Sequence, residues 1–188
     1  MTADFAAARS NMVESQVRPS DVTDHAIQDA MRRVPRETLV PADKAFLAYA
    51  DAEAEYAPGR WLLSPRDVGK LLQAVRPRPG EQALAVAAPY AALLLRDMGL
   101  EVTEVDAADP TPAGPFDVVV VEGAVAAPRP EWTAALGLGG RLGVVQRDGP
   151  VGRAMLYLRA PDGVGSRPLF DSTPSYLAGF EPAHGFSF

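Results

Sequence analysis

Apolar residues recur at helical spacing through the first part of the chain. Residues 4–16 and residues 27–34 each carry one apolar stripe, which is typical of amphipathic helices packed against a core. Asp21 or Thr23 is the candidate cap of the second helix, and Pro35 marks its end. The pattern therefore predicts a helical N-terminal region.

The pattern changes after residue 50. A short helical piece is predicted over residues 42–50, and the acidic, irregular residues 51–59 are interpreted as a junction. Ser64 followed by Pro65 is typical of a helix start, with serine as the cap and proline in the first helical position. That helix is predicted to run to Val75.

From residue 80 onward, short apolar strands alternate with helices. The β-branched run over residues 117–122 is typical of a parallel strand buried on both faces. Two facing segments separated by Pro161-Asp162-Gly163 predict a β-hairpin. The remaining predicted elements are strands at 82–87, 101–105 and 141–146, helices at 90–98 and 131–136, a turn at 137–140, and hairpin arms at 153–158 and 166–170.

These elements predict an α/β fold with a mostly parallel sheet and a C-terminal antiparallel hairpin. We expect an N-terminal helical subdomain at residues 1–58 and an α/β domain at residues 59–188. Residues 105–117 contain three prolines, which excludes the usual crossover helix. An extended strap across one end or face of the sheet is predicted there instead.

Composition narrows the classes of function. The chain has 188 residues, 47% of them hydrophobic and 22% charged, with a formal net charge of −6. Such an acidic chain lacks the electrostatic footprint expected for nucleic-acid binding. It contains no cysteine, no secretory leader pattern and no apolar run of the ~18 residues that a membrane span needs. We expect a cytoplasmic protein with neither nucleic acid nor membrane as its partner.

The connection between residues 82–87 and 90–98 lies where a nucleotide-binding α/β protein has a glycine-rich turn. Such turns use glycine to reach positive φ and to bring backbone N–H groups close to the ligand. Here the turn reads Ala87-Ala88-Pro89, and Pro89 has no N–H group. We expect a stiff turn without a grip on a cofactor.

Several segments in order along nearly the whole chain resemble the protein-L-isoaspartate O-methyltransferase family. The tail, from Gly152-Arg153 to Gly179-Phe180, is similar to a bacterial subgroup. The other segments that carry the resemblance are Met12-Val-Glu-Ser-Gln16, Ala30-Met31-Arg-Arg-Val-Pro35-Arg36-Glu37, Leu39-Val40-Pro41, Ala48-Tyr49-Ala-Asp51, Leu63-Ser64-Pro65, Arg78-Pro79-Gly80, Pro115-Phe116-Asp117 through Glu122, and Gly139-Gly140-Arg141-Leu142.

The resemblance implies a seven-stranded Rossmann-like class I methyltransferase sheet with an added N-terminal helical layer. It also implies S-adenosylmethionine as methyl donor and an isoaspartyl carboxylate as acceptor. The family's glycine loop falls on Ala87-Ala88-Pro89, and its active-site serine falls on Leu63, with Ser64 one residue away. The helix and strand that normally cover adenine are missing from residues 105–117, so a truncated sheet is expected.

Three carboxylates remain candidates for cofactor binding. Asp106 and Glu104 are the available acids for the ribose hydroxyls, although a solvated acid at a strand end is the commoner situation. Glu122 lies at the carboxyl edge of a central strand, where open α/β sheets bind ligands. A polar strand terminus is the simpler interpretation for Glu122.

Other motifs have simple structural interpretations. Gly137 to Gly140 fits a helix cap with a tight turn, and Ser64 fits a helix cap rather than a hydrolase nucleophile. Neither histidine has acidic neighbours at metal-ligand spacing, so no metal site is expected. The two histidines are His25 and His184, and the cluster Arg32, Arg33 and Arg36 is interpreted as solvated or ion-paired. Of the apolar residues Trp61, Leu63 and Trp132, Trp61 and Leu63 are expected to plug the pocket. The alternative is that they form an exposed apolar patch for a partner.

The leading hypothesis is a catalytically inactive member of this family, a pseudoenzyme retained as a binding or scaffold module. It would act as a homodimer or with another protein, and no cofactor is predicted. The first alternative is an active carboxyl methyltransferase with a rebuilt S-adenosylmethionine site. The second is a small-ligand binder at the sheet edge near Glu122 and Asp106. The sequence leaves open whether the segment after Asp171 packs on its own domain or on another copy.

Overall fold

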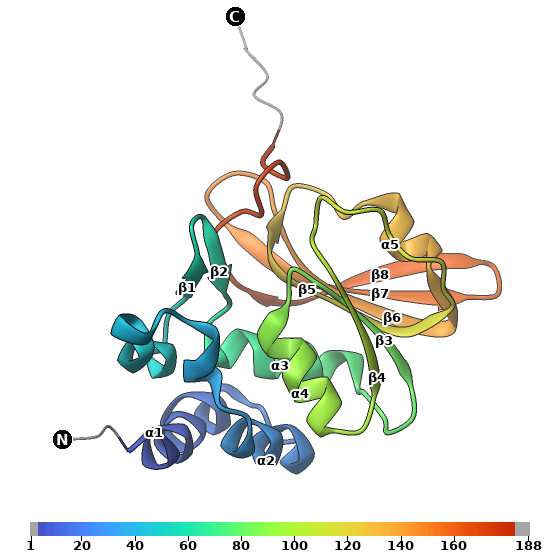
Figure 1. The fold of residues 1–188 in the computed structure, drawn as a ribbon. Helices are drawn as coiled ribbons and strands as arrows, with labels where there is room; N and C mark the ends of the chain where they lie inside the picture. Colours follow the sequence, from blue (N-terminus) through green and yellow to red (C-terminus); the bar gives the residue numbers. More distant parts are fainter. Residues whose placement is uncertain (1–3, 183–188) are drawn as a thin grey trace, which may run out of the picture.

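The protein is built around one six-stranded sheet, described here from a computed structural model over residues 4–182 (Figure 1). The strand order is β4-β3-β5-β6-β7-β8. The first four strands in this order are parallel, and β7 and β8 continue the sheet as an antiparallel hairpin. The strands are β3 (Gln82–Val86), β4 (Glu101–Val105), β5 (Phe116–Val125), β6 (Leu136–Arg147), β7 (Gly152–Ala160) and β8 (Gly163–Asp171).

This sheet confirms the predicted α/β class and its C-terminal hairpin. It has one strand fewer than the seven that the resemblance implies, because no strand forms between β4 and β5. Most predicted strand bounds agree within a few residues. The predicted turn at 137–140 is wrong, since these residues belong to β6. The pairing of β5 with β6 is irregular there, because the register shifts between Phe116 and Val118. The two strands approach closely at this point, since a Cβ at Gly140 would lie 2.8 Å from the Phe116 carbonyl oxygen.

The N-terminal helices follow the predicted apolar stripes. Helix α1 (Phe5–Met12) continues through a π-helical turn, η1 (Val13–Val17), and a 3-10 turn, η2 (Arg18–Ser20). Helix α2 (His25–Arg33) begins at Asp24, whose carboxylate accepts hydrogen bonds from the Ala26 and Ile27 amides. The predicted caps Asp21 and Thr23 are therefore wrong. Asp21 has a left-handed φ of 65° instead.

The segment predicted to be an irregular junction contains a small hairpin. After the 3-10 turns η3 (Arg36–Leu39) and η4 (Ala42–Tyr49), β1 (Ala54–Ala57) pairs antiparallel with β2 (Arg60–Leu62). Gly59, at φ 69°, supplies the turn between the two strands. The sequence pattern did not reveal this hairpin, because its strands have only four and three residues and lie in an acidic segment.

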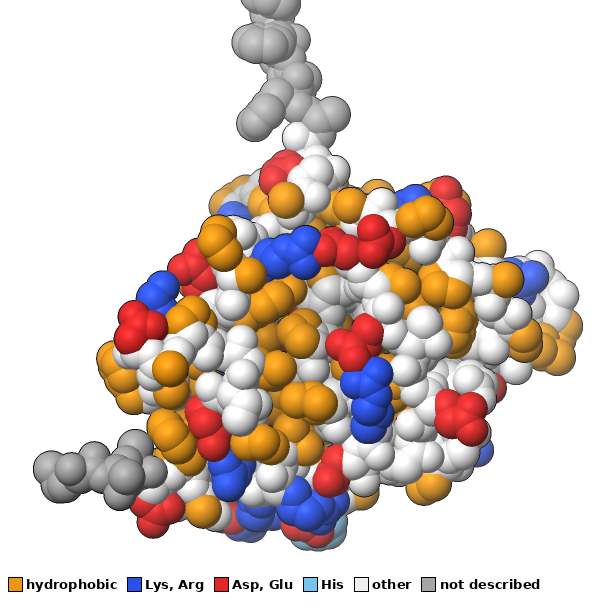
Figure 2. Space-filling model, in the orientation of Figure 1, with side chains coloured by type: hydrophobic (Ala, Val, Ile, Leu, Met, Phe, Trp, Pro, Cys, Tyr) orange, Lys and Arg blue, Asp and Glu red, His pale blue; other side chains and the backbone are white. Residues whose placement is uncertain are grey.

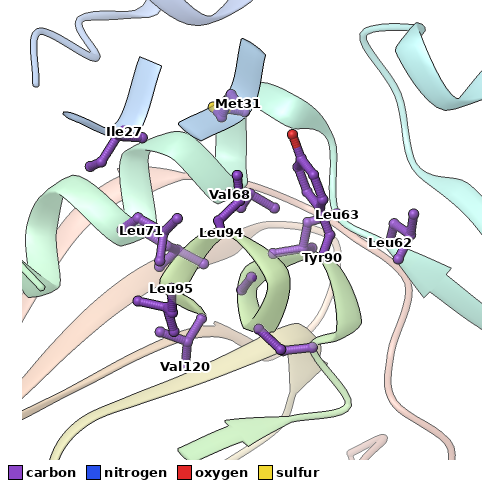
Figure 3. Packing of buried hydrophobic residues seen from close by; sticks show 14 of the residues in the cluster. Ile27, Met31, Leu62, Leu63, Val68, Leu71, Tyr90, Leu94, Leu95 and Val120 are labelled. Carbon is purple, nitrogen blue, oxygen red and sulfur yellow. The ribbon is translucent and has the colours of Figure 1, made fainter. Parts of the chain in front are cut away.

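Helix α3 (Pro65–Val75) begins as predicted. The Ser64 hydroxyl accepts a hydrogen bond from the Asp67 amide at 3.2 Å, and Pro65 occupies the first helical position. Together with α4 (Pro89–Asp97) and the N-terminal helices, α3 covers one face of the sheet. Figure 3 shows this buried cluster, with α2 side chains above those of α3 and α4 and Val120 of β5 below.

The opposite face is covered without a crossover helix. Residues 106–115 form the predicted strap, and α5 (Pro130–Ala134) lies beside it. The Arg129 guanidinium fixes the strap by donating hydrogen bonds to the carbonyl oxygens of Ala107 and Asp109, at 3.1 and 3.0 Å. The strap therefore replaces a helix as the cover of this face.

Residues 172–182, the described part of the segment after Asp171, pack on the sheet of the same chain. The Ala124 amide donates to the Ser175 carbonyl and the Leu177 amide donates to the Ala124 carbonyl, both at 2.9 Å. Gly123 has φ 139°, and a Cβ there would lie 2.6 Å from the Leu177 side chain. Glycine is needed at this position because the returning chain passes so close to β5.

Charged side chains lie mostly in mixed pairs around the molecule. On the face shown in Figure 2, hydrophobic side chains gather in the middle, over α4, and acidic and basic groups adjoin one another around them. Among the helices of residues 4–182, none is both long and apolar enough to cross a membrane.

Candidate functional site

The turn between β3 and α4 adopts a strained conformation without glycine. Ala87 has φ 46°, in the left-handed region that L-residues avoid, and its amide donates to the Val105 carbonyl at 2.8 Å. The expectation that alanine removes positive φ from this turn is therefore wrong. Ala87 keeps this left-handed conformation despite its steric cost, because the hydrogen bond to Val105 at the end of β4 holds the backbone in place.

This strain gives a testable expectation. Ala87→Gly should raise the free energy of unfolding by about 0.5–1 kcal/mol, because glycine adopts this φ without a Cβ penalty. The measurement is urea denaturation, with Ala85→Gly in the middle of β3 as the matched control. Ala85→Gly should be destabilising, and equal losses in both variants would contradict the assignment of strain to Ala87.

Glu122 lies inside β5 and is completely buried, at 0% exposure. Its Oε1 accepts a hydrogen bond from the Ala91 amide at 2.6 Å, and its Oε2 accepts one from the Leu63 amide at 3.3 Å. Ala91 is in the first turn of α4, where unpaired backbone N–H groups attract an anion. An internal carboxylate thus occupies the helix end that the sequence suggested for a ligand. The interpretation of Glu122 as a polar strand terminus is wrong, because β5 continues to Val125.

Arg36 is the second buried charge, also at 0% exposure. Its guanidinium donates to the Ala48 carbonyl at 2.8 Å and to the Leu63 carbonyl at 2.6 Å. It also stacks over the Tyr90 ring, 4.6 Å from the centroid. The sequence placed Arg36 with solvated arginines. That prediction is correct only for Arg32 and Arg33, which pair with carboxylates at the surface.

Burial controls the ionisation of this pair. Desolvation raises the pKa of Glu122 to about 7, although the positive charge of Arg36 and the two amide hydrogen bonds act against the rise. Desolvation likewise lowers the pKa of Arg36, opposed by Tyr90 and Glu122. Within residues 4–182, Arg36 Nη1 and the Tyr90 hydroxyl have no hydrogen-bond partner. Leu63 connects the two charges, since its amide faces Glu122 and its carbonyl faces Arg36.

Asp106 lies at the carboxyl end of β4, as predicted, but its carboxylate is engaged. Arg60, from the β1–β2 hairpin, forms an ion pair with it. Asp106 and the Tyr56 hydroxyl together raise the pKa of Arg60. A hollow of about 310 Å³ remains beside this pair, lined by residues that include Ala87, Ala88, Pro89 and Glu104. Glu104 itself pairs with Arg96.

The two predicted plugs behave differently. Leu63 is fully buried beside Glu122, whereas Trp61 is half-buried and lines a separate hollow next to η4. Trp61 is not among the residues that line the hollow beside Ala87, Ala88 and Pro89, so it does not plug that hollow. Trp132 is buried on the opposite face and stacks on Phe180, with ring centroids 5.4 Å apart. Ser64 is buried as a helix cap.

His25 has no contact with the residues of this site. His25 is the first residue of α2, and His184 lies outside the described residues. Residues 4–182 contain no group of three side chains that could hold a metal ion.

The parallel sheet, the turn at the start of α4 and the acid that ends β4 define a class I methyltransferase fold. A putative protein-L-isoaspartate O-methyltransferase from Plasmodium falciparum, in complex with S-adenosyl-L-homocysteine, matches 93% of this chain and 98% of its own with a TM-score of 0.73 and 14% identity. A second structure, of a protein-L-isoaspartate O-methyltransferase, matches 84% of this chain and 63% of its own, with a TM-score of 0.67 and 15% identity.

Curated sequences identify the family. The protein-L-isoaspartate O-methyltransferase of Methylorubrum populi is 32% identical over 192 residues, which cover 86% of this chain and 90% of that protein. The one from Methylorubrum extorquens is 39% identical over 105 residues, covering 55% of this chain and 46% of its own. Comparison with protein-family models finds no match. This chain belongs to the protein-L-isoaspartate O-methyltransferase family.

S-adenosylmethionine does not fit the residues at this edge. Pro89 has no N–H to offer, the Ala91 amide is bonded to Glu122, and Asp106 is paired with Arg60. The hollow of about 310 Å³ lies at the lower limit of the ~300–1,000 Å³ found for ligand pockets, and it is open.

Proposed function

We propose that this chain is a family member that has lost methyl transfer and acts as a binding or scaffold module. The observation that carries the proposal is the Glu122 carboxylate, which accepts the Ala91 amide at 2.6 Å. A donor site in this fold depends on free backbone N–H groups at the start of α4. Here that helix end is satisfied from within the protein.

Two further contacts support the proposal. Arg60 neutralises Asp106, the acid expected to hold ribose hydroxyls. The strap at residues 106–115 contains neither the helix nor the strand that would cover adenine. Methyl transfer depends chiefly on positioning donor and acceptor in contact. A chain without a donor cradle loses that contribution.

The test is a thermal-shift titration with S-adenosyl-L-homocysteine, followed by a radiolabelled methyl-transfer assay on an isoaspartyl peptide. We expect no saturable shift and no labelled peptide. A ligand at a hundred times its Kd would stabilise the fold by about 2.7 kcal/mol, so binding would be readily detected. An active relative, such as the Methylorubrum populi protein, serves as a positive control if it shows both signals.

An active methyltransferase with a rebuilt site is the second candidate, favoured by the remaining hollow beside Asp106. A clear shift together with methyl transfer would establish it and would overturn the proposal. A shift with no transfer would instead favour a small-ligand binder at this edge.

Restoring the glycines offers a sharper test of why binding is lost. The triple variant Ala87→Gly, Ala88→Gly and Pro89→Gly should still bind no S-adenosyl-L-homocysteine, because Glu122 and Arg60 keep their partners. Saturable binding by this variant would show that the turn alone had closed the site.

A further inference from the structure

The amino edge of the sheet, opposite the site described above, carries a groove lined by arginines. Two adjoining hollows, of about 510 and 730 Å³, lie there between the end of α3 and the β7–β8 hairpin. They share four lining residues, three of them arginines and none of them an acid: Ala74, Arg76, Arg78 and Arg167. We call these two hollows together the arginine groove.

Unpaired positive charge is concentrated in this groove. Of the 18 Lys and Arg side chains, all of which lie within residues 4–182, eleven form an ion pair with a carboxylate. Four of the remaining seven line the arginine groove, although the protein as a whole is acidic. The seven are Arg36, Lys70, Arg76, Arg78, Arg147, Arg159 and Arg167.

Four carboxylates also line the arginine groove, and three of them have partners. Glu81 forms an ion pair with Arg141, at 2.9 Å, and the Asp117 carboxylate accepts the Gln82 amide. In the second hollow, Asp24 caps α2, and Asp21 is among the lining residues with Thr23. None of these acids belongs to the lining that both hollows share, and that shared part is cationic because it holds Arg76, Arg78 and Arg167.

Arg76 has an unusual backbone conformation. It ends α3 in the left-handed region, at φ 47°, a position where glycine is strongly preferred. Strained residues of this kind concentrate at sites of function. Arg76 is exposed, and its guanidinium has no carboxylate partner among residues 4–182.

The floor of the arginine groove is apolar. Leu156 and Leu158 of β7 line it, and Leu158 is 46% exposed. Leu138 at the edge is 74% exposed. Arg167 is the cross-strand partner of Leu156, so charge and aliphatic surface are presented on the same face of the sheet. A simple inorganic anion would use the arginines and leave the leucines exposed.

We propose that the arginine groove binds an acidic peptide segment of a partner protein, one that also carries aliphatic side chains. Its carboxylates would pair with Arg76, Arg78 and Arg167, and its apolar side chains would cover Leu138 and Leu158. Such complementarity gives specificity and faster association. Nucleic acid suits the groove less, because bases bind by stacking on aromatic rings and the ring of Phe170 in the lining is already covered by the Lys70 ammonium, 4.6 Å from the centroid.

The test uses the full chain and a short fluorescein-labelled peptide with repeated Glu-Glu-Leu, followed by fluorescence polarisation. A peptide with lysine in place of glutamate and an oligodeoxythymidine are the comparison probes. We expect saturable binding of the acidic peptide alone, weakened as salt rises because exposed charges are screened. Binding of the lysine peptide, or preferred binding of the oligonucleotide, would overturn the proposal.

Variants locate the binding surface. Arg76→Gly combined with Arg78→Gln and Arg167→Gln should weaken peptide binding roughly tenfold or more. Arg76→Gly alone should keep the protein folded, since glycine fits the left-handed φ. Arg159→Gln is the matched control, because Arg159 also lacks an acidic partner but lies on the opposite face of β7. It should bind the peptide within about twofold of the parent.

An equal loss of peptide affinity in Arg159→Gln and in the triple variant would overturn the proposal. So would a dimer, seen by light scattering, that dissociates in the triple variant, because a second copy would then occupy the groove. None of these measurements depends on methyl-donor binding. The two proposals can therefore fail separately.

Discussion

Replacing Arg36 by methionine is expected to lower the free energy of unfolding by about 3–5 kcal/mol. The change leaves the carbonyl oxygens of Ala48 and Leu63 buried without their donors, which sit at 2.8 and 2.6 Å. It also removes the positive charge that favours ionised Glu122. Methionine roughly preserves the volume over the Tyr90 ring, so the loss reports lost polar contacts more than a cavity.

Chemical denaturation of Arg36→Met and Arg33→Met measures this effect. Arg33 is on the preceding helix, its side chain is 57% exposed, and it pairs with Asp97. Its replacement should cost less than about 1 kcal/mol, because exposed ion pairs contribute little. Similar losses at the two positions would contradict the role assigned to buried Arg36.

The free energy of unfolding should fall as pH rises, because the buried Glu122 side chain loses its proton. Its pKa is about 7 in the folded protein, above the ordinary value of 4.5. Between these values the folded state holds a proton that the unfolded state has released, so raising the pH favours unfolding. Relative to Glu122→Gln, the parent should lose on the order of 2 kcal/mol between about pH 5 and about pH 8.

The comparison between the parent and Glu122→Gln removes the contribution of other titrating groups. Urea denaturation at several pH values gives both curves, and their difference should level off above the folded-state pKa. Glu104→Gln, in the exposed strand β4, provides a control that should keep the pH dependence of the parent. A difference between the parent and Glu122→Gln that is independent of pH would show that Glu122 does not titrate in this range.

Together, Arg36 and Glu122 satisfy buried polar groups at the carboxyl edge of the sheet. Glu122 satisfies the start of α4 and the Leu63 amide, and Arg36 satisfies the Leu63 carbonyl from the other side. Buried polar groups must find such partners, because leaving them unpaired costs the full desolvation penalty. The N-terminal helical layer thus contributes directly to the closed edge, through Arg36.

The sequence by itself determined the order and type of most elements. Alternating apolar strands and helices predicted the parallel sheet, Ser64-Pro65 predicted the start of α3, and three prolines predicted the strap before β5. These features are local, since hydrophobic period, capping and proline geometry act over a few residues. The same local information missed the hairpin at Ala54–Leu62, whose strands are stabilised chiefly by their surroundings.

Only the tertiary structure decided the chemistry of the edge. Nothing adjacent to Glu122 in sequence indicates that its partners are Leu63 and Ala91, or that Arg36 leaves the arginine cluster for the core. Ala87 likewise takes a left-handed φ that its side chain disfavours. In each case the environment of the residue is set by segments that are distant in the sequence. Contacts within the packed fold compensate for burying a charge or for adopting a disfavoured backbone angle, and local sequence preferences therefore do not predict the outcome.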